Sequence, residues 1–499
     1  MSLTRCLLLA SIVGVLAAVG AEAVRAQTTT PPSAETAAPP PSVLPALSAG
    51  PFGFLSASAD SSTLLGDMGG LKPPPPTDSN KYGISLNITE QAETFGNLTG
   101  GVQQGFEVNG LTTVQVQLKT QKFGLDGGLF NVSGLHIWGG NLSETYLDNL
   151  QTVTGVEADP TILLWELWYQ QNFGNRFDIK IGEQSLDQEF EFMDCQKESA
   201  VFLNSMMGWP MLASADLLGG GPDYPLAALG VRAHAQMTDA TNVLAGVFNG
   251  SPIPKNSPNT QLSNPNGVSF PLNTGIFAIA ELQFTYGGSG ASAKPSADGP
   301  LKGTYKIGAW YDSDSFDDLQ YDDQGVPLAS PASNGIPARH HGNYSIYGVL
   351  NQMIWSSKDD SKPNISVFVR PMFTTLEDRN LINFSVNAGL TVQAPLSLAA
   401  IDGRGDDTFG LGMGVARVSS SASGYDRDLE FYEPTVYTPV RGTETFLEAT
   451  YQIAATKWLQ IQPDIQYVFN PGAGLANPND PTQKIKNELV IGLRTNITF

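Results

Sequence analysis

The last twelve residues of the chain, ELVIGLRTNITF from Glu488 to Phe499, alternate between two kinds of side chain. Successive side chains of a β-strand point to opposite faces, so this alternation predicts a strand with an apolar side and a polar side. The apolar side would carry Leu489, Ile491, Leu493, Thr495, Ile497 and Phe499, and the polar side Glu488, Val490, Gly492, Arg494, Asn496 and Thr498.

The same alternation recurs many times upstream of this strand. Most repeats have the roughly 9 to 11 residues that cross a bilayer obliquely, and barrels of about 16 to 18 strands enclose an aqueous pore. We therefore predict an all-β chain that forms a transmembrane antiparallel β-barrel of about 16 strands. The predicted strands are 83–90, 111–120, 129–138, 161–173, 176–184, 228–238, 241–249, 275–286, 302–312, 344–354, 363–373, 381–393, 408–418, 443–455, 457–469 and 487–499.

Composition and charge agree with this class. Only 15% of the residues are charged, against about 25% in soluble domains. The 27 basic and 48 acidic residues give a formal net charge of −21, which repels phosphate backbones, so no nucleic-acid partner is expected. Beyond the N-terminal segment, no stretch approaches the roughly 18 consecutive apolar residues of a transmembrane helix. A closed barrel is then the remaining way to satisfy every backbone group in lipid.

The N-terminal segment predicts export. Residues 1–26 have the parts of a cleaved signal peptide: Arg5, an apolar run from Cys6 to Gly20, and a small-residue end at Ala26. Residues 27–65, rich in Pro, Ala and Ser, are predicted to be a disordered periplasmic spacer, and residues 66–499 the barrel domain. After cleavage Cys195 would be the remaining cysteine, so no intramolecular disulfide is expected.

Connection lengths predict the orientation of the barrel. Outer-membrane barrels pair short periplasmic turns with longer external loops. Short turns are expected at 174–175, 239–240 and 456–457, and long outer loops at about 185–227, 250–274, 313–343 and 419–442. The loop 185–227 contains Met, Phe and Trp side chains that are unsuited to free solvent. We predict that it folds into the lumen and narrows it.

The strand parity assigns charged residues of both signs to the lumen. Such a lumen offers paired donors and acceptors to hydroxyl groups, whereas a strongly ion-selective pore would show one sign. Trp168 faces inward too, where an indole can pack against a sugar ring, although barrel filling and loop anchoring stay open as alternatives. The candidate substrate-binding residues are Glu166, Trp168, Arg176, Asp178, Lys180, Asp187, Glu189, Arg232, Arg370, Glu444, Glu448 and Arg494.

Other side chains are expected to have structural roles. An aromatic girdle at the membrane interface would account for the aromatic residues that the parity puts on the apolar face near segment ends, with plain packing as the alternative for each; they are Trp165, Tyr169, Tyr305, Tyr311, Tyr451, Tyr467 and Phe499. Six aspartates between Asp312 and Asp323 depart from the EF-hand pattern and are predicted to be a solvated charge run, with divalent cations bridging to lipid headgroups as the alternative. The chain has no G-x-S-x-G elbow, P-loop, H-E-x-x-H motif or cysteine pair for zinc. No enzymatic activity, cofactor or metal site is therefore expected.

Several segments, in this order, resemble the carbohydrate-selective porins of the OprB type in Gram-negative outer membranes. They are LLGDMGGLK at 64–72, FGNLTGG at 95–101, WELWYQQNFGNRFDIKIGEQSLDQEF at 165–190, GTYKIGAWYDS at 303–313, WLQIQPDIQYVFNPGAG at 458–474 and GLRTNITF at 492–499. The chain departs from the family at Lys72, where arginine is usual, and at Glu183, where lysine is frequent. These departures bear on the substrate more than on the fold.

The resemblance implies a pore for diffusion of monosaccharides such as glucose into the periplasm. The alternatives are a general or organic-solute diffusion porin without sugar selectivity and a soluble β-rich adhesin or binding protein. The partners to expect are carbohydrate solutes, outer-membrane lipid and lipopolysaccharide, and the barrel-insertion machinery. Monomer and homotrimer are both compatible with the sequence.

Overall fold

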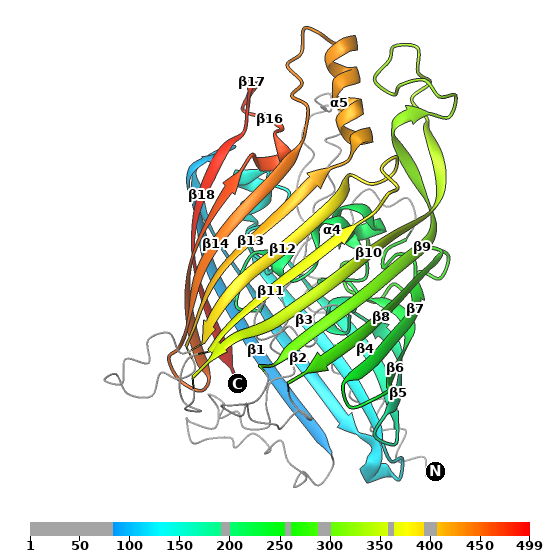
Figure 1. Cartoon of the computed structure of the whole chain (residues 1–499), viewed down its shortest axis with the longest axis vertical. Coiled ribbons are helices and arrows are strands. Elements are labelled where there is room, and N and C mark those ends of the chain that lie inside the picture. Colours follow the sequence, from blue (N-terminus) through cyan, green and yellow to red (C-terminus); the bar gives the residue numbers. More distant parts are fainter. Residues whose placement is uncertain (1–82, 191–199, 255–260, 288–300, 358–363, 394–406) are drawn as a thin grey trace, which may run out of the picture. The chain divides into compact units, whose positions relative to one another are not determined.

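Sixteen antiparallel strands close into a barrel within the part of the chain that the structure describes (Figure 1). The computed structural model describes residues 83–499 except 191–199, 255–260, 288–300, 358–363 and 394–406. The expected signal peptide and spacer, at 1–26 and 27–65, lie outside these residues. Each strand pairs with its neighbours in the chain, and the ring closes where β1 pairs with β18.

The barrel strands have the following bounds, and a short hairpin of β16 and β17 precedes the last of them. They are β1 (Ile84–Gly101), β2 (Gly105–Lys119), β3 (Gly128–Gly139), β4 (Thr161–Phe173), β5 (Phe177–Gln184), β6 (Ala228–Gln236), β7 (Thr241–Asn249), β8 (Ile276–Tyr286), β9 (Gly303–Asp322), β10 (Pro337–Ser356), β11 (Asn364–Phe373), β12 (Ile382–Gln393), β13 (Thr408–Val418), β14 (Thr443–Ala454), β15 (Leu459–Phe469) and β18 (Lys486–Thr498); the hairpin is β16 (Ala476–Asn477) and β17 (Asp480–Lys484).

Short helices occur in the connections. The α-helices are α4 (Met211–Asp216) and α5 (Ser420–Tyr432), and the single turns are η2 (Thr120–Phe123), η3 (Ser143–Leu147), η4 (Leu186–Gln188), η5 (Ser205–Met207), η6 (Leu218–Gly220), η7 (Gln261–Ser263) and η8 (Pro471–Ala473). Among the helices of the described ranges, none has the length and apolar character needed to cross a bilayer.

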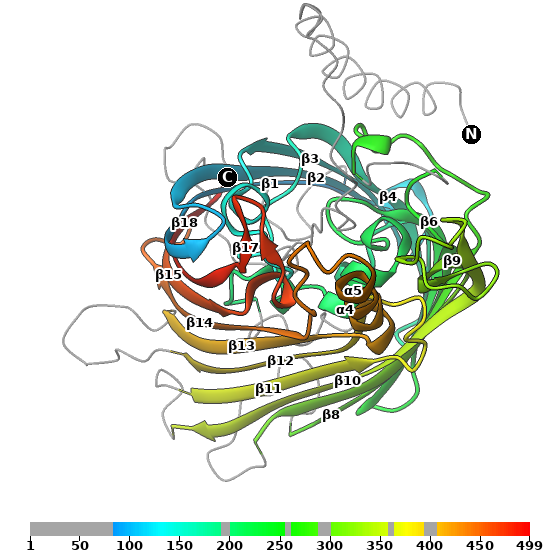
Figure 2. The same ribbon diagram turned by 90° about the horizontal axis from the view of Figure 1, so that it is seen from above.

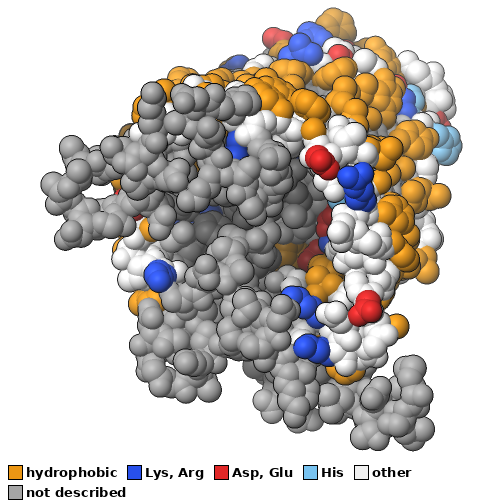
Figure 3. Space-filling view, turned by 60° about the horizontal axis from the view of Figure 1, so that its bottom comes forward, with side chains coloured by type: hydrophobic (Ala, Val, Ile, Leu, Met, Phe, Trp, Pro, Cys, Tyr) orange, Lys and Arg blue, Asp and Glu red, His pale blue; other side chains and the backbone are white. Residues whose placement is uncertain are grey.

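Alternation along the strands separates lipid-facing from lumen-facing side chains, as predicted. On β18, Ile491 and Leu493 are 37% and 47% exposed on the outer wall, whereas Val490 and Arg494 are buried inside. Exposed Leu, Ile, Val and Phe side chains recur along most strands. Hydrophobic side chains, drawn in orange, cover much of the outer wall that Figure 3 shows. The fold predicted from the sequence, a closed barrel of sixteen strands, is confirmed, and every predicted segment overlaps one barrel strand.

Four strands are clearly longer than predicted: β1 and β2 toward the turn between them, and β9 and β10 toward their tip. The extension of β9 corrects the interpretation of the aspartate run. β1 continues to Gly101, and β9 and β10 extend beyond the barrel wall as a paired hairpin (Figure 1). The predicted loop 313–343 is therefore largely strand. Asp312, Asp314, Asp318 and Asp322 lie buried on one face of β9, whereas Asp317 and Asp323 are exposed, so the run is solvated at those two positions and not as a whole. The strand period places alternate aspartates on one face, and Asp318 there pairs with His340 at 2.8 Å.

The connections differ in length at the two ends of the barrel. The end that carries Phe499 has short turns at 174–176, 237–240 and 455–458, and the opposite end carries α5, the hairpin of β16 and β17 and the tip of β9 and β10 (Figure 1). In an outer-membrane barrel the short turns face the periplasm. The short turns at one end and the long connections at the other follow the predicted pattern of connection lengths.

Two of the outer connections fold into the barrel. Viewed from above, α4 of the loop 185–227 lies within the ring of strands (Figure 2). In the same loop, Leu203 belongs to one buried cluster with Leu142, Leu147 and Val153 of the loop 140–160 and with Phe95 of β1. The prediction that the loop 185–227 enters the lumen is confirmed for its described residues.

Candidate functional site

A β-bulge in β4 decides which side chains of that strand face the lumen. Ser133 pairs with Glu166 and Gly134 with Leu164, so Trp165 is an extra residue between two pairs. Trp165 and Glu166 are consequently both buried inside the barrel. The prediction that Trp165 belongs to a lipid-facing girdle is wrong, because the bulge shifts the alternation by one residue.

Charged side chains converge on the lumen face of β5 and β6. Lys180 pairs across the strands with Arg232, and the carboxylate of Glu189, from the loop 185–227, forms ion pairs with both. The distance from Arg232 Nε to Glu189 Oε2 is 2.8 Å. Arg232 also binds Asp178, and the Lys180 ammonium lies 4.0 Å from the ring centroid of Trp168. We call Trp168, Asp178, Lys180, Glu189 and Arg232 the eyelet cluster.

His234 links the eyelet cluster to accessible space. Its Nδ1 lies 2.8 Å from Asp178 Oδ2, and its Nε2 lies 3.2 Å from Asn242 Oδ1. The side chain of His234 is 30% exposed, whereas those of Lys180 and Arg232 are 7% and 5% exposed. His234 therefore marks the more accessible side of the eyelet cluster.

The loop supplies two carboxylates with different environments. Burial raises the pKa of Glu189, but the Lys180 ammonium and the Arg232 guanidinium outweigh it and hold that pKa below its usual range. Burial raises the pKa of Asp187 to about 6, and its carboxylate accepts from Ser185 Oγ at 2.5 Å within its own loop. Glu189 thus stays ionised in the eyelet cluster, while Asp187 is directed at the loop.

Another predicted pore residue, Glu166, binds the loop 185–227. The Glu166 carboxylate accepts from the backbone N–H of Ser185 at 3.3 Å, at the base of the loop. Glu191, Phe192 and Asp194 of the same loop lie outside the described residues.

Four other predicted pore residues lie beneath the inward loops, away from the eyelet cluster. Arg370 donates to the carbonyl of Met207, and Glu448 accepts from the backbone of the same loop. Glu444 accepts from the backbone of the loop 140–160. Arg494 pairs with Glu93 on the neighbouring β1. These side chains bind protein groups in the structure.

Arg176 is not brought together with the other predicted residues. It lies at the short turn between β4 and β5, and its side chain is 64% exposed. Its guanidinium pairs with Asp239 of the next short turn, between β6 and β7, at 3.3 Å. Arg176 is a residue of the rim at the end of the barrel that carries the short turns.

Sequence reasoning missed several lumen residues that hold these loops. Glu93 is one, because the predicted first strand ended at residue 90 and the glycines of FGNLTGG obscured the alternation that continues to Gly101. Asn387 donates to the carbonyl of Met206, and Gln466 to that of Val153 at 2.7 Å. Both lie on lumen faces that the alternation does indicate, but uncharged amides gave no separate signal.

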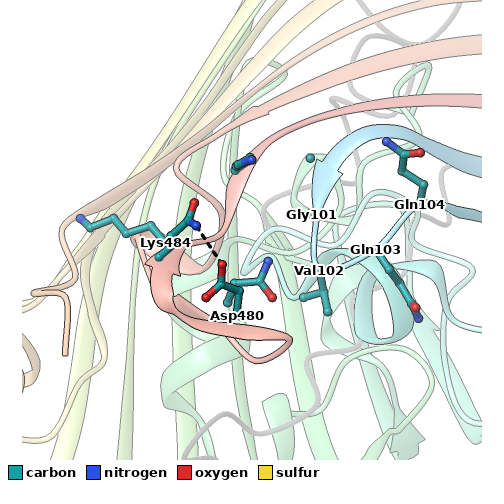
Figure 4. A pocket seen from close by; sticks show the side chains of 10 residues that line it. Gly101, Val102, Gln103, Gln104, Asp480 and Lys484 are labelled. Atoms are coloured by element: carbon teal, nitrogen blue, oxygen red, sulfur yellow. Dashed lines mark hydrogen bonds between the residues drawn. The ribbon is translucent and has the colours of Figure 1, made fainter. Parts of the chain in front are cut away.

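Two further features of the described residues lack the arrangement of a binding site. Among the residues described, no group of three His, Cys, Asp or Glu side chains is arranged to hold a metal ion. A pocket of about 440 Å³ lies between the β1–β2 turn and the β16–β17 hairpin (Figure 4). Its labelled side chains diverge: Gln103 and Gln104 point to opposite sides, and Lys484 extends away from Asp480. The pocket offers no convergent binding groups, unlike the eyelet cluster.

Comparisons with known proteins identify one family model and several similar porins. The family model described as "Carbohydrate-selective porin, OprB family" matches residues 103–499. Porin B of Pseudomonas aeruginosa is 23% identical over 467 residues, which cover 89% of this chain and 92% of that protein. The putative porin QuiX of Acinetobacter baylyi is 21% identical over 448 residues, or 85% of this chain and 91% of that protein. The high-pH structure of Pseudomonas putida OprB has a TM-score of 0.71 at 21% identity, covering 89% of this chain and 99% of that one.

Proposed function

This chain belongs to the OprB family of carbohydrate-selective porins, and we propose that it lets monosaccharides such as glucose diffuse across the outer membrane past the eyelet cluster. As a porin it is a channel, and we infer that passage through it involves no catalytic step and no cofactor. The observation that carries the proposal is the arrangement of Lys180, Arg232 and Glu189 beside the indole of Trp168.

The chemistry of the cluster suits a neutral polyol. Ammonium and guanidinium groups donate hydrogen bonds, carboxylates accept them, and an aromatic face packs against the C–H groups of a sugar ring. Because Lys180, Arg232, Asp178 and Glu189 pair with one another, their charges balance and favour neither anions nor cations. Conduction requires binding that is weak enough for release, so the affinity for sugar should be modest.

The test compares two arginines. Arg232→Ala should weaken the block of single-channel current by glucose, because it removes donors from the eyelet cluster. Arg176→Ala is the matched control: the same substitution at the exposed rim should leave the block unchanged. A channel whose current responds equally little to glucose in the parent protein and both variants would favour the alternative, a general diffusion porin without sugar selectivity.

Further parts of the proposal concern export and assembly. We propose that residues 1–26 are removed as a signal peptide, that residues 27–65 are a periplasmic spacer and that residues 66–499 form the barrel domain. The C-terminal strand β18, with Phe499 at its end, would be presented to the barrel-insertion machinery. The apolar outer wall would contact outer-membrane lipid and lipopolysaccharide. The porin would be a monomer or a homotrimer.

A further inference from the structure

The loop 185–227 is tied to opposite walls of the barrel. Near its start, Glu189 binds Lys180 of β5 and Arg232 of β6. Further along, the backbone N–H groups of Leu203 and Asn204 donate to the two carboxylate oxygens of Glu448 on β14, at 2.5 and 3.2 Å. In the ring of sixteen strands β14 lies eight places from β6, directly across the lumen.

A second carboxylate on β14 holds the loop 140–160. Glu444 accepts from the backbone N–H groups of Leu150 at 2.8 Å and Gln151 at 2.7 Å. Its Oε2 also accepts from Gly472 in η8 at 2.7 Å. The strand period puts Glu444 and Glu448 on the same face of β14, and both are at most 1% exposed.

The two loops are also joined to each other next to these carboxylates. Ser205 donates its backbone N–H to the carbonyl of Thr152 at 3.0 Å, and Gly155 donates to Leu203 at 3.0 Å. The Asn204 side chain bridges the carbonyl of Gln151 and the amide oxygen of Gln466, at 3.2 and 3.1 Å. The loops therefore dock on β14 as one unit, and a loss of either carboxylate contact affects both.

We propose that Glu444 and Glu448 are positioning residues that fix the two inward loops against β14 and thereby set the cross-section of the pore, without contacting the solute. Hydrogen bonds from backbone N–H groups to a carboxylate are stronger than neutral ones and resist exchange with water. If Glu444 and Glu448 instead bound a lysine side chain of the loop, they would fix only that flexible side chain. Main-chain donors instead fix the path of the loop itself.

The first test measures ion current in the full-length porin without sugar. In Glu448→Ala, two N–H donors lose their acceptor. The equilibrium constant for undocking of the loop rises tenfold for a loss of only about 1.4 kcal/mol, and hydrogen bonds to charged groups are typically stronger than this. We therefore expect the loop to be undocked about ten times more often or more, and the open-channel current noise to rise in proportion. Glu444→Ala should act in the same direction. The Gln variants retain one acceptor oxygen and should lie between. Glu430→Ala, at an exposed position of α5, is the matched control and should show the current noise of the wild-type porin.

A second pair of variants tests the same contact from the loop and guards against misfolding of the Ala variants. Asn204 has φ −55°, close to the value of about −65° that proline imposes, so Asn204→Pro removes the N–H donor without strain in φ at that residue. Asn204→Ala keeps the N–H and removes only the side-chain bonds. We expect greater noise in Asn204→Pro than in Asn204→Ala.

The outcomes separate this proposal from the function on which it rests. Equal noise in the two Asn204 variants, or wild-type noise in folded Glu448→Ala, would overturn the positioning role whatever glucose does to the current. A wild-type protein without glucose block would count against sugar passage and leave the noise comparison intact. Heat-modified migration on a detergent gel identifies the folded variants.

Discussion

A single buried carboxyl in the loop 140–160 illustrates how much one residue contributes to docking. Glu157 accepts from the backbone N–H of Leu142 at 3.0 Å and from that of Ser143 at 3.3 Å. Burial raises its pKa to about 8, against an ordinary value of 4.5, and the nearby Glu93 carboxylate adds to the effect. Docking of this loop therefore takes up a proton at neutral pH.

The sign of the resulting pH dependence follows from this shift. Between the ordinary value of 4.5 and about 8, the undocked carboxyl is ionised while the buried one keeps its proton. The docked loop thus loses stability as the pH rises through this window. We expect hydrogen-exchange protection of residues 142–147, corrected for intrinsic exchange, to fall by at most about tenfold per pH unit.

Glu157→Gln should flatten this dependence, because the amide stays neutral at every pH. Glu144→Gln, at an exposed position in the same loop, should keep the wild-type slope. An identical slope in Glu157→Gln would mean that another group controls docking of the loop.

At the scale of elements, glycines in β12 and β13 form the surface on which the loop 185–227 packs. Phe202 of the loop lies over Gly389, Gly410 and Gly412, and it meets Phe368 edge-on with ring centroids 5.7 Å apart. A Cβ at Gly412 would lie 2.7 Å from the Phe202 ring and 2.6 Å from Met207 Cε. The alternating glycines at 410, 412 and 414, which miss the spacing of a dinucleotide site, serve close packing.

Gly412→Val should displace Phe202 and the segment that contains Met207. Overpacking of this kind typically costs about 1–3 kcal/mol, here in loop docking more than in barrel closure. We expect noisier single channels with unchanged heat-modified migration. Gly442→Val is the control, since a Cβ there meets nothing within 4 Å. Quiet channels in Gly412→Val would show that the loop accommodates the added volume.

At the scale of the whole molecule, the strands form the closed wall and a separate set of inward loops narrows the pore. The wall is continuous backbone pairing, including the β1–β18 closure. The loops narrow the lumen and bring Glu189 to Lys180 and Arg232. Removing a loop should therefore change permeation and leave the wall closed.

Shortening residues 188–215 tests this division. The deletion removes Glu189 from the eyelet cluster and the partners of Glu448 from β14. We expect ion conductance to rise and glucose block to disappear together, with the barrel still heat-modifiable. Unchanged conductance would mean that the loop does not limit the pore and that the selectivity argument built on it is wrong.

The sequence by itself determined the wall of this protein. A strand has a fixed period of two, so the alternation around Ile491 and Arg494 predicts which side chains face lipid and which face the lumen. Sixteen such segments, separated by turns and loops of unequal length, also predict the closed barrel and its orientation. The charged lumen face follows from the same period, including Lys180 and Arg232.

Only the tertiary structure decided what those lumen side chains touch. Trp165 turns inward because of a bulge that no local pattern indicates, and Arg176 lies at the rim because its strand ends at the turn. Glu448 binds a loop more than 240 residues away in the chain, at Leu203. The two-residue period of a strand determines which face each side chain points to, and this is a local property of the backbone. The groups that a lumen side chain contacts depend instead on where a long loop crosses the lumen. That path is set by contacts between segments far apart in sequence.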